Sequence, residues 1–119
     1  MDLVAFLGND KENWGQITAL INKIKECDKI VLVKDKETKE FPSNEKCIII
    51  EIDSKRSLTE IKKEIHDKIK RELGDDFEVA LSIVSGRGKE HMALISAQLS
   101  IPVGVRFVAY TKEGIEFFN

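Results

Sequence analysis

LSIVSGRGKEHMALIS, residues 81–96, passes from an apolar segment through a small basic loop into an amphipathic segment. The apolar residues predict a buried strand, and the loop holds a Gly-x-Gly turn with two cations, Arg87 and Lys89. A helix that begins directly after such a loop points its first N–H groups and the positive end of its dipole into the turn. The stretch therefore predicts a strand–loop–helix unit with an anion site at the loop.

The same alternation of strand and helix patterns extends along the chain on both sides of this unit. Apolar or β-branched runs predict strands at 3–8, 29–33, 47–53, 77–84, 103–110 and 115–118, and apolar stripes predict helices over 14–24, 58–73 and 89–100. A capping box at 57–60 opens the second helix, and Gly74 is placed to end it. Residues 34–46 are charged and predict an exposed connection.

These elements predict one α/β domain over residues 1–119, a three-layer sandwich around a mostly parallel, Rossmann-like sheet. We expect the strand order 3-2-1-4-5-6, with the last strand antiparallel because the preceding turn is too short for a helical crossover. In that order the loops after the first and fourth strands face each other at the topological switch point. The candidate ligand-binding residues are then Gly8, Asn9, Asp10, Ser85, Gly86, Arg87, Gly88 and Lys89.

Composition and charge limit the classes of partner. The chain has 19 Lys and Arg against 21 Asp and Glu, a net charge of −2, which gives no general attraction to duplex nucleic acid or to an acidic membrane. No apolar run approaches the ~20 residues of a membrane span, so we expect a cytoplasmic protein. Two cysteines and two histidines in unrelated contexts indicate neither a disulfide framework nor a metal site, and no cofactor is expected.

The basic loop does not match two common phosphate-binding motifs. A Walker A loop would need glycine in place of Ile83 and a hydroxyl in place of Glu90. A dinucleotide motif would need glycine in place of His91 and would follow the first strand. The remaining interpretations are an anion nest built on Gly86 and Gly88, or a tight turn whose cations are only solvated.

The run V-S-G-R-G-K between strand and helix resembles the core of CRISPR-associated Rossmann-fold (CARF) domains, which carry a T-G-G-T-K-type loop after the fourth strand. The likeness extends to a short first strand ending in glycine, to Asp53 as the acidic residue closing the third strand and to a late strand ending in Tyr110. By position, Ser85 matches the hydroxyl, Gly86 the first glycine and Lys89 the lysine, whereas Arg87 and Gly88 depart from the pattern. The chain also lacks the usual helix between the second and third strands, as expected of a minimal, stand-alone archaeal member.

The resemblance implies a homodimer that binds a nucleotide second messenger, cyclic oligoadenylate, across paired clefts in CRISPR-type antiviral signalling. One alternative is a metal-independent ring nuclease, in which the ribose 2′-OH of the ligand attacks the adjacent phosphate, with Lys89 and His91 as candidate catalytic residues. The other alternative is a ligand-free protein-interaction scaffold with the same fold.

Overall fold

A central sheet organises the chain, which a computed structural model describes over residues 1–42, 44–73 and 77–119. Within these ranges the sheet has six strands in the order β3-β2-β1-β4-β5-β6. The first five strands are parallel to their neighbours, and β6 is antiparallel to β5. The predicted Rossmann-like order and the antiparallel last strand are both confirmed.

The observed elements differ from the predicted ranges by one or two residues at their ends. In chain order they are β1 (Asp2–Leu7), a 3-10 turn (Lys11–Asn13), α1 (Trp14–Lys23), β2 (Ile30–Asp35), β3 (Cys47–Ile52), α2 (Leu58–Glu72), β4 (Glu78–Ser82), α3 (Gly88–Leu99), β5 (Gly104–Thr111) and β6 (Gly114–Phe117). The capping box forms, with Ser57 Oγ accepting a hydrogen bond from Glu60 N–H. The proposed helix stop at Gly74 lies outside the described residues.

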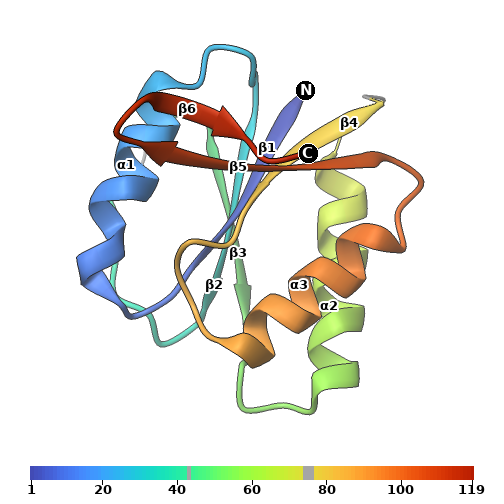
Figure 1. Ribbon diagram of the computed structural model, residues 1–119. Helices are drawn as coiled ribbons and strands as arrows, with labels where there is room; N and C mark the ends of the chain where they lie inside the picture. The colour runs from blue at the N-terminus through green and yellow to red at the C-terminus, as the bar shows by residue number, and fades with distance from the viewer. Residues whose placement is uncertain (43, 74–76) are drawn as a thin grey trace.

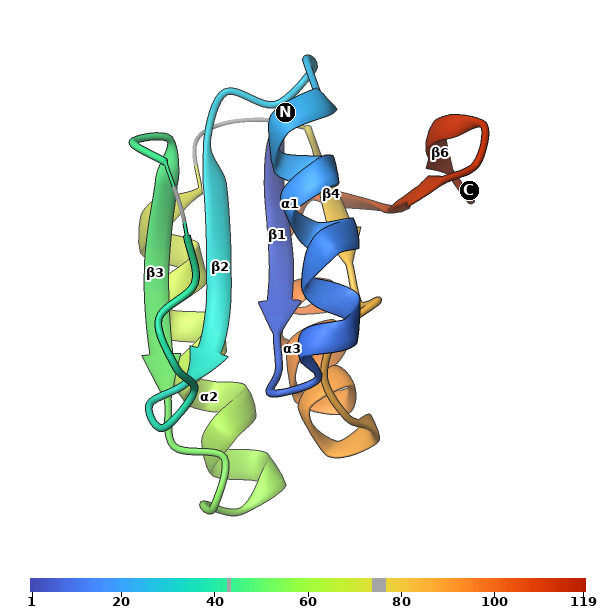
Figure 2. The same ribbon diagram turned by 90° about the vertical axis from the view of Figure 1, so that its left-hand side faces the viewer.

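Helices cover both faces of the sheet. α1 packs on one face, and α2 and α3 pack side by side on the other (Figures 1 and 2). Every residue of β1 is buried because the strand is central and covered from both sides. The predicted stripes face the sheet: Ile61 and Ile65 of α2 are fully buried, and half-buried Trp14 packs edge-on against Phe41 with 5.4 Å between ring centroids.

The helices of the described residues also bear on membrane association. None of them has the combination of length and apolar character that crossing a bilayer requires. The longest, α2, alternates its buried isoleucines with charged residues along its 15 positions.

The loops after β1 and β4 meet at two glycines, because β1 and β4 are neighbouring parallel strands. A Cβ placed on Gly8 would lie only 2.7 Å from Gly86 Cα and 2.9 Å from Gly86 N. Gly86 itself has a φ of +103°, and a Cβ there would lie 2.6 Å from the ring of Phe6. Both positions require glycine, so the close approach predicted from the switch point is confirmed and is a backbone-to-backbone contact.

Replacing Gly8 by alanine is therefore expected to destabilise the fold by about 1–3 kcal/mol or more, because rigid backbone atoms must move apart. Gly15→Ala in α1 is the matched control, since a Cβ there meets nothing within 4 Å. It should stabilise the protein by about 0.5–1 kcal/mol through helix propensity. Urea unfolding measures both changes, and a Gly8→Ala protein as stable as the wild type would contradict the close packing.

Candidate functional site

A buried hydrogen-bond chain joins the loop after β1 to the loop after β4. Ser85 Oγ accepts a bond from Gly8 N–H at 2.9 Å and donates to Asp10 Oδ1 at 2.7 Å. The same carboxylate oxygen accepts a bond from Gly86 N–H at 3.1 Å. Ser85 is fully buried, so its hydroxyl depends entirely on these partners.

Three further side chains form hydrogen bonds to the residues of this chain. Asn13 Nδ2 donates to Asp10 Oδ2 at 2.7 Å, and Trp14 Nε1 donates to the Gly8 carbonyl at 2.9 Å. His91 Nε2 lies 2.7 Å from the Ser85 carbonyl, which requires that this nitrogen carry the proton. Both loops are therefore fixed by side chains from the first turns of the helices that follow them.

The carboxylate of Asp10 already accepts the hydrogen bond of the Gly86 N–H, and Gly86 is the first glycine of the proposed anion nest. Burial alone would raise the pKa of Asp10, but the hydrogen bonds from Asn13, Ser85 and Gly86 outweigh it and lower the pKa below its ordinary value. Asp10 is thus held in its charged form by the very loop that was expected to bind an external anion.

An open cleft of about 740 Å³ lies beside this chain, at the ends of the parallel strands. In Figure 2 the arrowheads of β1, β2 and β3 all point to this end of the sheet. Its lining comes from the loops after β1 and β4, from the end of β2 and from the β3–α2 loop: Asn9, Asp10, Glu12, Asp35, Glu37, Ser54, Lys55, Gly86, Arg87, Lys89 and Glu90.

Two of these side chains fix the β3–α2 loop across the cleft. Lys89 Nζ donates to the carbonyls of Ser54 and Arg56 at 3.1 and 2.8 Å. Asp35 Oδ1 accepts bonds from the N–H and hydroxyl of Ser54 at 2.8 and 2.7 Å. Burial would raise the pKa of Asp35, but these bonds, the Glu37 N–H and the charge of Lys36 lower it. The loop is therefore held by one cation and one carboxylate that both face the cleft.

The charge balance of the cleft is acidic. Its lining residues include five carboxylates and three cations. Lys55 forms an ion pair with Glu37 at 3.4 Å, and Lys89 is hydrogen-bonded to carbonyls of the β3–α2 loop. Arg87, in contrast, is exposed at the start of α3. Burial raises the pKa of Glu90, although its Oε1 accepts a bond from Arg87 N–H. Among the described lining residues, Arg87 is the cation best placed to meet an anion.

The structure separates the sequence-predicted residues into three groups. Asn9, Asp10, Gly86, Arg87 and Lys89 line the cleft. Gly8 and Ser85 lie beneath it as ties between the loops. The lining does not include Gly88, His91, Asp53 or Tyr110, and Tyr110 instead accepts a bond from Lys23 Nζ at 2.9 Å.

Sequence reasoning missed the contribution of β2 and β3. Asp35, Glu37, Ser54 and Lys55 line the cleft because the ends of parallel strands meet at one edge of the sheet. Polar residues at or just after the ends of these two strands are the sequence signal for this part of the cleft.

Neither a metal cluster nor a known family accounts for the cleft. Among the described residues, no three His, Cys, Asp or Glu side chains are grouped to hold a metal ion. No model of a known protein family matches the chain, and no curated protein matches it. The fold is Rossmann-like.

Removing the Asp10 carboxylate is expected to destabilise the fold by about 1–3 kcal/mol at neutral pH, because Asp10→Ala leaves the buried Ser85 hydroxyl without its acceptor. Since the folded-state pKa of Asp10 is lowered, the stabilisation is present above its unfolded pKa of about 3.9 and is lost as the pH falls through the folded value.

Urea unfolding from pH 7 to pH 3 should therefore show the difference between wild type and Asp10→Ala narrowing with acidification. Glu12→Ala, an exposed carboxylate of the same loop, is the control and should change stability little. A difference that stays constant over this pH range would contradict the charged tie.

Removing the Lys89 ammonium is expected to loosen the β3–α2 loop. In Lys89→Ala the amides of residues 53–57 should exchange with solvent faster, because two carbonyls of that loop lose their donor. Hydrogen exchange followed by mass spectrometry measures this, with Lys63→Ala on the exposed side of α2 as control. Unchanged exchange in residues 53–57 would show that the Lys89 contacts do not order the loop.

Proposed function

We propose that this chain is a nucleotide-binding domain that takes a phosphodiester second messenger, cyclic oligoadenylate by resemblance to CARF domains, in the cleft beside Asp10. One observation carries the proposal: the cleft lies at the topological switch point, where the loops after β1 and β4 meet beside the start of α3. Its size falls within the range of small-molecule sites, roughly 300–1,000 Å³.

The chemistry of the lining suits a ligand with few charges and many donors. Arg87 and the first N–H groups of α3 are the partners for one phosphate, since the first turn of a helix has no internal acceptors for its N–H groups. The carboxylates of Glu12 and Glu90 are acceptors for ribose hydroxyls and an adenine amino group. An adenylate unit carries one negative charge and several such donors, and therefore fits an acidic cleft better than a compact polyphosphate does.

The proposal extends to the biological setting and to the partner. The CARF resemblance supports a role in CRISPR-type antiviral signalling, with a homodimer as the binding-competent form. In this homodimer each protomer supplies one cleft, lined by the loops after β1 and β4. The function that we propose is binding without cleavage. The two candidate catalytic side chains, Lys89 and His91, are both hydrogen-bonded to main-chain carbonyls.

A second candidate function is a ligand-free interaction scaffold. The specific observation in its favour is that Asp10 fills the Gly86 N–H from within the chain. In that case the loop is a structural tie, and the cations beside it are not ligand contacts.

Calorimetry and thermal shift with cyclic tetra- and hexa-adenylate distinguish the two functions. A ligand at about 100 times its dissociation constant should stabilise the protein by about 2.7 kcal/mol. Arg87→Ala should weaken binding by about 1.5–3 kcal/mol at fixed salt, because it removes a charge-assisted contact to phosphate.

Lys63→Ala, which removes a cation from the exposed side of α2, is the control and should bind as the wild type does. Absence of any shift with the cyclic oligoadenylates would support the scaffold. Equal affinity of wild type and Arg87→Ala would remove Arg87 from the site.

A further inference from the structure

β3 is an edge strand, and only some of the backbone groups on its outer side are hydrogen-bonded within the described part of the chain. Among the described strands it pairs only with β2, at the side of the sheet opposite β6 (Figure 2). Ile30 N–H bonds to the Lys46 carbonyl and Lys36 N–H to the Ile52 carbonyl, so even-numbered residues of β3 point their backbone groups toward β2. The N–H and C=O groups of Cys47, Ile49 and Glu51 therefore point outward.

Two of these six outward groups are already used within the chain. Cys47 N–H donates to the Asn44 carbonyl at 3.0 Å, and the Glu51 carbonyl accepts a bond from Lys68 Nζ at 2.9 Å. Within the described residues no partner is recorded for the N–H and C=O of Ile49, the N–H of Glu51 or the C=O of Cys47. A β-branched edge with unpaired backbone groups is a template for another strand.

The four remaining groups are complementary to themselves. We propose that β3 pairs antiparallel with β3 of a second copy of this chain, about a two-fold axis at Ile49. In that register Ile49 exchanges both of its backbone bonds with Ile49 of the second copy, and each Glu51 N–H donates to the other copy's Cys47 carbonyl. The two groups that are already satisfied, Cys47 N–H and Glu51 C=O, are the two that would otherwise face each other.

Side chains along the edge agree with this register. Ile49 is 40% exposed in the isolated chain, and pairing covers it with its own counterpart. Ile48 of each copy lies opposite Ile50 of the other, which gives two close apolar cross-strand pairs. These contacts supply the apolar part of the interface.

Charges beside the edge are also complementary under the same two-fold axis. The groove of about 300 Å³ between β3 and α2 is lined by the charged residues Glu51, Lys68, Arg71 and Glu72 beside the three isoleucines of β3. Lys68 lies at the Glu51 end of β3, and the Glu72 carbonyl accepts a bond from Lys29 Nζ at the Cys47 end. Exchanging the two ends places Lys68 of each copy opposite Glu72 of the other.

The interface is small, and its geometry has a consequence for the clefts. A single six-residue strand edge is a small contact, below the roughly 1,200 Å² at the lower end of standard interfaces, so we expect a weak association. Because the two copies of β3 run in opposite directions, the two clefts lie at opposite ends of the strands in the shared sheet. Each cleft in this pair then acts alone, so this association is distinct from the homodimer of the proposed function and does not depend on what the cleft binds.

Sedimentation equilibrium from about 10 µM to about 1 mM tests the pairing. The wild type should pass from monomer to dimer over this range. Ile49→Lys should raise the dissociation constant by about tenfold or more, because two like charges then lie directly opposite each other. Leu99→Lys, at an exposed apolar position of α3, is the matched control and should associate as the wild type does.

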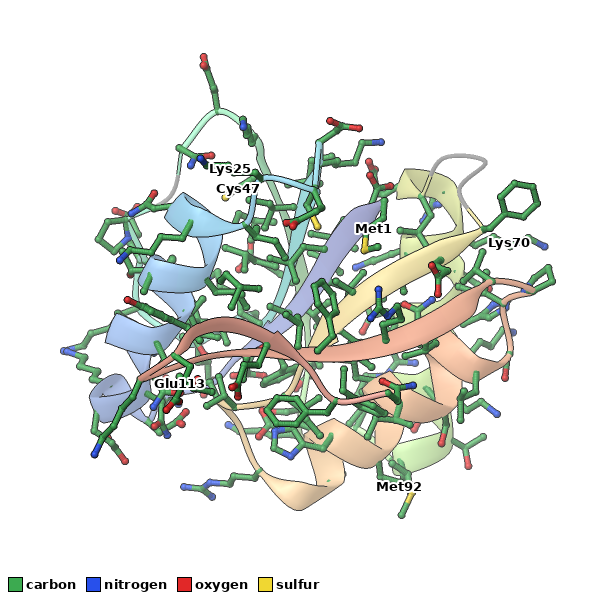
Figure 3. All side chains as sticks on the ribbon, turned by 45° about the horizontal axis from the view of Figure 1, so that its top comes forward. Met1, Lys25, Cys47, Lys70, Met92 and Glu113 are labelled. Carbon is green, nitrogen blue, oxygen red and sulfur yellow. The ribbon has the colours of Figure 1, made fainter. Side chains whose placement is uncertain are left out.

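Amide exchange provides a second measurement that needs no mutation. The amides of Ile49 and Glu51 should become protected as the concentration rises, whereas those of Ile50 and Ile52, which face β2, should be protected throughout. A wild type that stays monomeric at about 1 mM would overturn the proposal. So would association lost in Leu99→Lys and kept in Ile49→Lys, because the interface would then be on α3, where Met92 projects from the same helix (Figure 3).

Discussion

The contact between the backbones of Gly8 and Gly86 is the constraint on which the rest of this end of the molecule depends. With Cβ atoms on either residue the two loops could not approach closely enough for Ser85 Oγ to bond both Gly8 N–H and Asp10. The hydrogen-bond chain in turn fixes the first turn of α1 through Asn13 and Trp14, and that of α3 through His91. Two residues without side chains therefore set the positions of two helices.

That same contact decides which groups remain for a ligand. Gly86 N–H is used by Asp10, so in the proposed function a phosphate is placed at the start of α3 and Arg87 rather than at the glycine turn. The half-buried Asp10 carboxylate and an incoming phosphate would compete for one N–H, and the carboxylate has the advantage of being held in place by three donors. A ligand that leaves Asp10 undisturbed gains affinity over one that must displace it.

The sequence was sufficient for the fold because its pattern is regular. Continuous apolar runs, stripes at three- and four-residue spacing and the Ser57–Glu60 capping box each have one straightforward interpretation, and the structure agrees with them. Topology alone then placed Asp10 near Ser85.

The directions of the cleft side chains could not be obtained in the same way. Lys89 looks like a phosphate ligand in the sequence, yet its acceptors are the carbonyls of Ser54 and Arg56, 33 to 35 residues away. Main-chain carbonyls have no sequence signature, because every residue carries one. Asp35 is equally ambiguous, since its partner Ser54 is recognisable only once β2 and β3 are known to be neighbours.

β3 connects the cleft and the exposed edge of the sheet over a few residues. Its last outward carbonyl, that of Glu51, is bonded by Lys68 from α2, and three residues later Ser54 is bonded by Asp35 and Lys89 from the cleft. Lys34 adds an ion pair to Glu51 at 3.5 Å from the neighbouring strand. A ligand that withdrew Lys89 from the Ser54 carbonyl would loosen the loop after β3 but leave the ladder between β2 and β3 intact from Cys47 to Ile52. The strand is therefore anchored independently at its edge and at the cleft, so the proposed association through Ile49 does not depend on the proposed binding beside Asp10.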